Sequence, residues 1–315
     1  MTTDIEKRLL ALQKQVRAAN LSVKPAEVTV LEPSFPKTEA EVLAKESEFF
    51  EKLFLPSLLS AAWLPRQGSR VMKHERAYGN LSIIVSTGYR KGLKPIYLPT
   101  GIIPRRILSA LTTKAVVTQS RFVDVSSISA LLKDMNLAIN GPQIKRVQKQ
   151  VLQLARSRVE INFTYRDPDS EKEKVVFFDG AIFRRLDAEI EETGQGRLIP
   201  NVIEFDPRFY ELVLKGHAVP YSKQLYECSS SLTHDVFLWM ERRFYNSDET
   251  EVNIHYPMLW KQFGGGKSMT GVFKQRIKES MKEVSKLLKM KVHLGKKSVT
   301  LHAPKRDPFG FDAIE

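Results

Sequence analysis

The sequence predicts an α+β fold built from two similar units in tandem, which follow an N-terminal helix and a linker. The same order of elements, helix, helix, basic helix and hairpin, is predicted twice along the chain. The two basic helices are expected to begin 126 residues apart, at Pro142 and Ser268. Positive charge is concentrated in these same two parts of the chain. A repeated order of elements indicates an internal structural repeat, although the two copies share little sequence.

Composition restricts the class of protein. The chain has 315 residues, of which 42% are apolar and 27% charged, as in globular proteins of two domains. No apolar run reaches the roughly 18 residues of a membrane span, so no membrane association is expected. The N-terminus mixes acids and bases, unlike a secretory or transit peptide. Cys228 is the single cysteine, which favours a reducing compartment, and we expect a cytoplasmic protein.

The net charge of +13 points to a polyanionic partner. Residues 101–160 hold 10 bases and 3 acids, and residues 255–315 hold 13 bases and 5 acids. The rest of the chain holds 26 bases and 28 acids, so two windows carry all of the excess. Nucleic acid is the leading candidate for such a footprint, and a solvated basic surface without a partner is the alternative.

The predicted domains divide the chain at residues 45 and 195. Residues 1–45 are expected to form a helix over residues 4–18 and then a linker that contains three prolines. The apolar stripe of this helix suits a partner or its own domain equally well. Residues 46–195 and 196–315 are the two repeated units.

In the first unit, strands are predicted around Gly88 and Gly92, and Pro104 opens a helix. A second helix is capped by Ser126 or Ser127, and the third, basic helix runs from Pro142 to about Ser157. The segments "VEINFTYR" and "KVVFF" then form a hairpin across the acidic turn "DPDSEKE".

In the second unit, "SSLTHDVFLWMERRFYN" and "YPMLWKQFG" are predicted helices. A basic helix follows over residues 268–288, with Ser268 as its N-cap, and "KVHL-GKK-SVTLHA" forms the hairpin. A helix-turn-helix followed by a hairpin, or wing, is the winged-helix arrangement, whose third helix enters the major groove of DNA. The sequence therefore predicts two tandem winged-helix domains.

Helical periodicity predicts which residues of the two basic helices face the DNA. Ile144, Val147, Val151 and Leu154 form the inward stripe of the first, and Met269, Phe273, Ile277, Met281, Val284 and Leu288 that of the second. Two lysines at the tip of the second wing are placed to reach a phosphate, whereas the acidic tip of the first is repelled by DNA. The second unit is therefore expected to bind more strongly. The predicted DNA-binding residues are Lys145, Arg146, Lys149, Gln153, Arg156, Ser268, Gly271, Lys274, Gln275, Lys278, Lys282, Lys296 and Lys297.

Enzymatic alternatives find little support. "GGGKS" ends like a phosphate-binding loop, but Lys261 occupies the place of its first glycine and no strand-like run precedes it. The six histidines form no His-x-x-x-His pair, and one cysteine cannot build a structural zinc site. Cys228 has no recognisable base motif near it and is expected to be buried or incidental. We expect no catalytic residue, cofactor or metal, and a nucleotide hydrolase or nickase is the enzymatic alternative.

Several segments between Ile96 and Pro308 resemble the plasmid replication initiators of the RepA C-terminal family. The match is carried by Leu98, Pro99, Gly101, Pro104 and Arg105, and by the Thr118–Arg121 segment. In the second half it is carried by "FDPRFYELVL", "HDVFLWMERRFY", "MLWKQFGGG…FKQRIKESMKEV" and "VTLHAPKRDP". The turn at Gly264–Gly266 is richer in glycine than in many members, which leaves the orientation of the second basic helix open.

The resemblance implies an initiator whose tandem winged helices bind direct repeats, or iterons, in double-stranded plasmid origin DNA. It also implies origin opening, recruitment of the host replicative helicase and the host initiator, and a switch between homodimer and monomer. The alternative is a winged-helix transcriptional regulator without a role in replication, which shares every feature derived from the residues.

Overall fold

The computed structural model describes eleven segments of the chain between Lys52 and Ala303. The N-terminal helix and linker predicted within residues 1–45 lie outside the described residues. Within them, no helix is both long enough and apolar enough to cross a membrane. The described segments are residues 52–56, 63–67, 70–78, 81–88, 97–125, 128–166, 173–190, 198–211, 218–244, 249–264 and 269–303.

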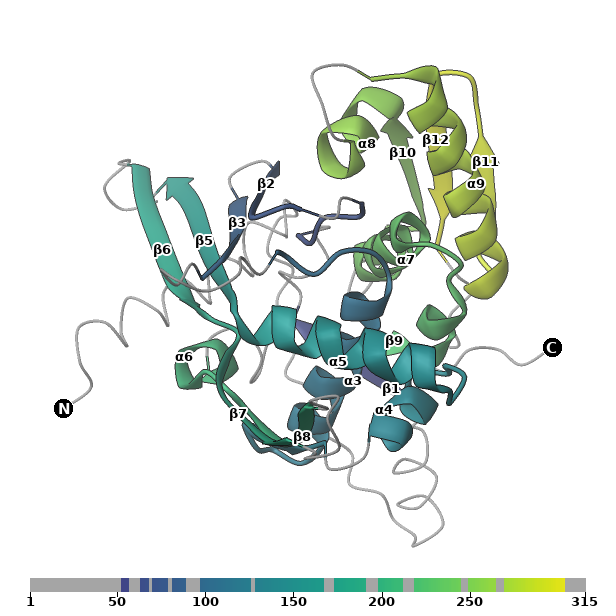
Figure 1. Cartoon of the computed structure of the whole chain (residues 1–315). Helices are drawn as coiled ribbons and strands as arrows, with labels where there is room; N and C mark the ends of the chain where they lie inside the picture. Colours follow the sequence, from purple (N-terminus) through teal and green to yellow (C-terminus); the bar gives the residue numbers. More distant parts are fainter. Residues whose placement is uncertain are drawn as a thin grey trace, which may run out of the picture.

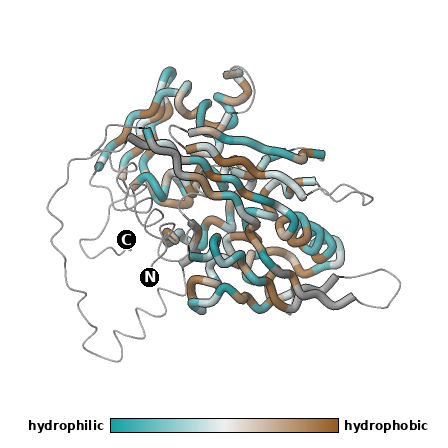
Figure 2. The backbone as a smooth tube through the Cα atoms, turned by 90° about the vertical axis from the view of Figure 1, so that its left-hand side faces the viewer, coloured by the Kyte–Doolittle hydropathy of each residue, from teal (hydrophilic) through white to brown (hydrophobic). Residues whose placement is uncertain are grey.

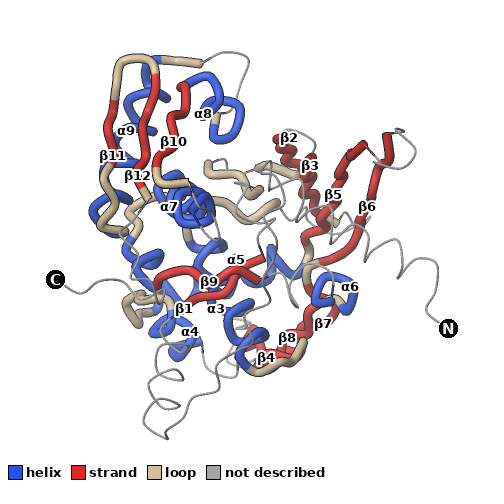
Figure 3. Tube along the Cα trace, turned by 180° about the vertical axis from the view of Figure 1, so that it is seen from behind, coloured by secondary structure: helices blue, strands red, loops and turns tan. Residues whose placement is uncertain are grey.

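The architecture is α+β, with helices packed against small antiparallel sheets (Figure 1). The predicted fold class is confirmed at this level. Figure 3 shows the same elements from behind, with the helices in blue and the strands in red. Along the tube in Figure 2, hydrophobic and hydrophilic segments alternate, as expected for elements with one buried face.

The first helical unit follows the order predicted from the sequence, with one additional strand. Pro104 lies in the first turn of α3, where its missing N–H would have no helical partner. Asn140 caps α5 by accepting a hydrogen bond from the backbone N–H of Gln143 at 3.0 Å. The elements are α3 (Ile103–Val117), β4 (Phe122–Asp124), α4 (Ile128–Asp134) and α5 (Gly141–Ala155).

The predicted hairpin after α5 is confirmed, but it belongs to a different sheet from the one expected of a wing. Strands β5 (Ser157–Arg166) and β6 (Glu173–Ala181) pair antiparallel, and β5 also pairs with β3 (Leu81–Thr87). With β2 (Lys73–Tyr78) they form a four-stranded sheet in the order β2-β3-β5-β6.

A second hairpin pairs with β4, the strand between α3 and α4. It consists of β7 (Phe183–Ile190) and β8 (Leu198–Phe205), and the sheet order is β4-β8-β7. β8 lies beyond residue 195, so the strand pairing of the first unit crosses the predicted domain boundary. The short helix α6 (Pro207–Phe209) follows.

The helices and the hairpin predicted for the second unit are present, and the strand β10 lies between its first two helices. Its three-stranded sheet has the order β10-β12-β11, which matches β4-β8-β7 element for element. The elements are α7 (Ser231–Phe244), β10 (Glu251–His255), α8 (Tyr256–Phe263), α9 (Gly271–Leu287), β11 (Val292–Leu294) and β12 (Ser298–His302).

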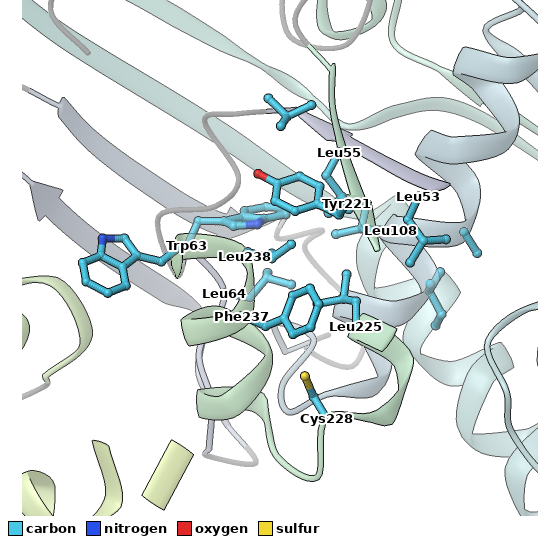
Figure 4. Close-up of a cluster of buried hydrophobic side chains, with 14 of the residues drawn as sticks. Leu53, Leu55, Trp63, Leu64, Leu108, Tyr221, Leu225, Cys228, Phe237 and Leu238 are labelled. Carbon is cyan, nitrogen blue, oxygen red and sulfur yellow. The ribbon is translucent and has the colours of Figure 1, made fainter. Parts of the chain in front are cut away.

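The two units share a hydrophobic core (Figure 4). Strand β1 (Lys52–Pro56) pairs antiparallel with β9 (Ala218–Ser222), and the 3-10 helix η3 (Lys223–Glu227) follows. Side chains from this pair meet residues of α3 and α7. Each large apolar side chain that is fully buried contributes about 1.5–3 kcal/mol to folding. The labelled members of the cluster are Leu53, Leu55, Trp63, Leu64, Leu108, Tyr221, Leu225, Cys228, Phe237 and Leu238.

Candidate nucleic-acid interface

Helix α9 is held in place by its buried stripe and by α8. Phe273, Ile277, Met281 and Val284 are buried, as periodicity predicts. The ring of Phe273 packs edge-on against that of Trp260 in α8, with centroids 4.8 Å apart. This packing leaves the opposite face of α9 open to solvent.

The start of α9 differs from the prediction. Its N-cap is Thr270, whose hydroxyl accepts a hydrogen bond from the N–H of Phe273 at 3.2 Å, so the prediction of Ser268 as N-cap is wrong. Ser268 itself lies outside the described residues. Met269 was assigned to the buried stripe, but 40% of it is exposed because it precedes the helix and does not follow its periodicity.

The outward face of α9 carries Val272, Gln275, Arg276, Glu279 and Lys282, all exposed. Gln275 and Lys282 were predicted there, as was Gly271, which is also exposed. The prediction did not include Arg276. Successive residues of a helix point in different directions, so Arg276, which directly precedes the buried Ile277, lies away from the buried stripe and could have been identified. The Nε2 of Gln275 donates to Glu279 at 2.6 Å, so the amide and the carboxylate lie side by side on this face.

Lys274 and Lys278 lie on the flank of α9 that faces Tyr256, the first residue of α8. Their Nζ atoms lie 4.6 Å and 5.6 Å from the centroid of the Tyr256 ring. Lys274 also donates to the carbonyl of Lys296. Lys278 is half-buried rather than fully outward as predicted, because it packs on this ring.

The hairpin β11–β12 stands beside this flank. The hydroxyl of Tyr256 donates to the carbonyl of Gly295 at 3.1 Å, and its backbone N–H donates to the carbonyl of Lys297 at 3.2 Å. The hairpin tip is therefore fixed to the start of α8. Lys296 and Lys297 are both exposed, as predicted.

In the first unit, α5 exposes four of its five predicted residues. Lys145, Arg146, Lys149 and Arg156 are exposed. The prediction that Gln153 faces outward is wrong. It is 9% exposed, and its Nε2 donates to the carbonyl of Tyr97 at 2.8 Å, because α5 packs against the segment before α3 at this point.

A buried ionic cluster joins the two units. Asp235 of α7 accepts hydrogen bonds from the Nε and Nη2 of Arg105 in α3, at 2.7 Å and 3.0 Å. The Nε of Arg66 donates to the same carboxylate at 3.0 Å. Burial would raise the pKa of Asp235, but the two guanidinium groups outweigh it and hold the pKa below its usual range.

The same cluster reaches the turn before α9. Arg66 also donates to the carbonyl of Phe263, and Arg76 of β2 donates to the carbonyl of Gly264. Gly264 ends α8, and a Cβ there would lie 2.3 Å from the Trp260 ring, so only glycine fits. Sequence analysis did not identify this cluster, because its members are distant in the chain and each is unremarkable by itself.

The described residues contain no group of three or more His, Cys, Asp or Glu residues arranged to hold a metal ion. Cys228 is buried, as expected, and burial raises the pKa of its thiol well above the usual value. Lys267 and most of the "GGGKS" segment lie outside the described residues.

The fold is similar to that of domains 2 and 3 of RctB, a replication initiator of Vibrio chromosome II. One crystal structure matches with a TM-score of 0.50 and 12% identity over 78% of this chain and 96% of the RctB chain. A selenomethionine derivative matches with a TM-score of 0.53 and 12% identity over 78% and 97%. At this identity the likeness establishes a shared fold. No protein-family model matches the chain, and no curated protein does either.

Proposed function

We propose that this protein is a plasmid replication initiator that binds direct repeats in double-stranded origin DNA through two winged-helix domains. The observation that carries the proposal is the outward face of α9, beside a hairpin with a lysine-rich tip. An exposed helix with Gln and Arg on one face suits base edges in the major groove, and flanking lysines suit phosphates. The fold shared with an initiator and the resemblance to the RepA C-terminal family support the same conclusion.

The sheet orders support the winged-helix assignment. In a winged helix, a strand between the first two helices pairs with the returning strand of the wing. The order β10-β12-β11 fits this pattern, and β4-β8-β7 fits it in the first unit. On this assignment the first wing is β7–β8, and β5–β6 is an extension that joins β2–β3.

The proposed activity is binding and remodelling of DNA, without catalysis, in the bacterial cytosol. The proposed partners, beyond DNA, are the host replicative helicase and host initiator, and the protein is proposed to switch between homodimer and monomer. The host partners and the switch between homodimer and monomer are proposed from the resemblance to the RepA C-terminal family.

The test is permanganate reactivity of thymines in a supercoiled plasmid that carries the origin of the replicon encoding this protein. We expect the protein to protect the repeats and to make thymines beside them reactive, since permanganate oxidises unstacked thymines. Protection of a promoter without any reactive thymines would favour the alternative, a transcriptional regulator.

A further inference from the structure

The first two turns of α9 depart from what stability alone would favour. Val272, at the second helical position, is 62% exposed, and β-branched residues are mediocre helix formers. No acidic residue occupies the first turn, where the helix dipole would favour one. A Cβ on Gly271 would meet nothing within 4 Å, so the fold does not require glycine there. These features are understandable if DNA approaches this end of the helix.

The side chains on this edge suit adenine and thymine. Val272 offers two methyl groups to solvent, and the thymine C5-methyl is the apolar group of the major groove. Gln275 lies one turn further along the same edge, about 4.5 Å along the axis, close to the base-pair rise of about 3.4 Å. Gln is suited to form two hydrogen bonds with the N6 and N7 of adenine.

Glu279 orients the amide of Gln275 through the 2.6 Å hydrogen bond from Nε2. Nε2 carries two hydrogens, so it can keep this bond and still donate to adenine N7, while Oε1 accepts from N6. The carboxylate also disfavours guanine at this place, because guanine presents only acceptors, N7 and O6, to the major groove.

We propose that α9 reads two adjacent A·T pairs, with Val272 on the C5-methyl of a thymine and Gln275 on the adenine of the neighbouring pair. This inference rests on the proposed function, in which α9 enters the major groove. It goes further in naming the bases and the residues that select them.

The test begins with selection of duplexes with a randomised centre by the full-length chain. The enriched duplex is then synthesised with deoxyuridine in place of each thymine in turn, which removes one methyl group. At one position we expect the substitution to weaken wild-type binding about fourfold, the effect of one buried methyl group. Val272→Ser should bind the thymine and uracil duplexes equally at that position, because a hydroxymethyl group replaces the two methyl groups.

Gln275→Ala should lower the preference for adenine at the adjacent pair by about 5- to 150-fold. The control is Phe177→Ser, which alters a side chain of similar exposure (56%) on β6 and should leave both preferences unchanged. Equal wild-type binding to thymine and uracil at every position, or a methyl effect that survives in Val272→Ser, would overturn the inference while leaving sequence-selective binding intact. Failure of any duplex to be enriched would overturn the proposed function as well.

Discussion

Helices α5 and α9 are built in the same way. Each follows an extended N-cap residue whose side chain accepts a backbone hydrogen bond, and each has an exposed glycine at its first position. Those glycines lie 130 residues apart, and three buried residues of α5 have buried counterparts in α9 at the same offset. The pairs are Val147 with Ile277, Val151 with Met281, and Leu154 with Val284.

The outward faces of the two helices differ. α5 presents Lys145, Arg146 and Lys149, whereas the same positions of α9 are Gln275, Arg276 and Glu279. Arginine occupies the same position in both helices, as Arg146 and Arg276. The difference lies in the other two positions: lysines are point charges suited to phosphates, whereas Gln and Glu match particular base edges. If the proposed function is right, we expect α5 to contribute mainly contacts to phosphates and α9 mainly selectivity.

The surrounding charges differ as well. Half of the bases in the first charged window, residues 101–160, make contacts within the protein. Arg105 binds the buried Asp235, and Arg106 donates a hydrogen bond to the carbonyl of Cys228. Within the described residues, the bases of α9 form no salt bridge, so their charges are not paired with carboxylates. The other three of these five bases, in residues 101–160, form ion pairs: Lys114 with Asp134, Arg121 with Glu204, and Arg158 with Asp179.

The largest expected effect comes from breaking the connection between the two units. Asp235→Asn leaves Arg105 and Arg66 without their buried counter-charge, which should lower the free energy of unfolding by about 3–5 kcal/mol. Urea unfolding at neutral pH measures this loss. Asp179→Asn is the matched control, because it breaks an exposed ion pair and should change stability by less than about 1 kcal/mol. Equal losses would contradict the structural role of the cluster.

Arg276→Ala tests whether α9 selects the DNA sequence, by reducing the preference for the preferred duplex over a scrambled one. If Arg276 contacts a base edge, binding to the preferred duplex should weaken by about 1–3 kcal/mol, and binding to a scrambled duplex should weaken less. Fluorescence anisotropy with both duplexes measures the ratio. A uniform loss on both duplexes would assign Arg276 to the phosphates.

A third prediction concerns pH, through two histidines beside the ionic cluster. Burial lowers the pKa of His234 in α7 to about 3 and that of His74 in β2 to about 4. The folded protein therefore keeps both neutral, while the unfolded chain takes up protons below about pH 6.5. The free energy of unfolding is therefore highest above about pH 6.5 and falls as the pH is lowered. Protonation of Asp235 lowers it further, but only below about pH 4.

Urea unfolding at pH 7.5 and 5.5 should differ by about 2–3 kcal/mol for the wild type, since each histidine that stays neutral in the folded protein contributes up to about 1.4 kcal/mol over this pH range. His234→Leu should reduce this difference, whatever its effect on stability at pH 7.5. An unchanged difference in His234→Leu would mean that His234 is already protonated in the folded protein.

The smallest effect is expected from α5. Lys149→Ala should weaken binding to preferred and scrambled duplexes alike and reduce the slope of log affinity against log salt by about one. The corresponding loss for Lys296→Ala, at the tip of the β11–β12 hairpin, should be similar. A loss confined to the preferred duplex would contradict the division of roles between α5 and α9.

The repeated helices and hairpins could be predicted from the sequence because periodicity and capping are local properties. The buried stripe of α9 followed directly from Phe273, Ile277 and Met281. Gln153 was misplaced because its burial depends on Tyr97, which is 56 residues away. The partners of β4 and of Asp235 could not be predicted either, since long-range pairing leaves no local pattern.

The charge windows were informative only in part. They drew attention to α5 and α9, but charge alone could not distinguish Arg105, buried against Asp235, from Arg146, exposed on α5.

The central claim is tested most directly by titration of a fluorescent duplex from the replicon's own origin, beside a scrambled duplex, at two salt concentrations. The account predicts selective binding to the origin duplex, without any nucleotide, that weakens as salt rises. Equal and weak binding to both duplexes would contradict it, reducing the exposed bases of α5 and α9 to a general polyanion surface.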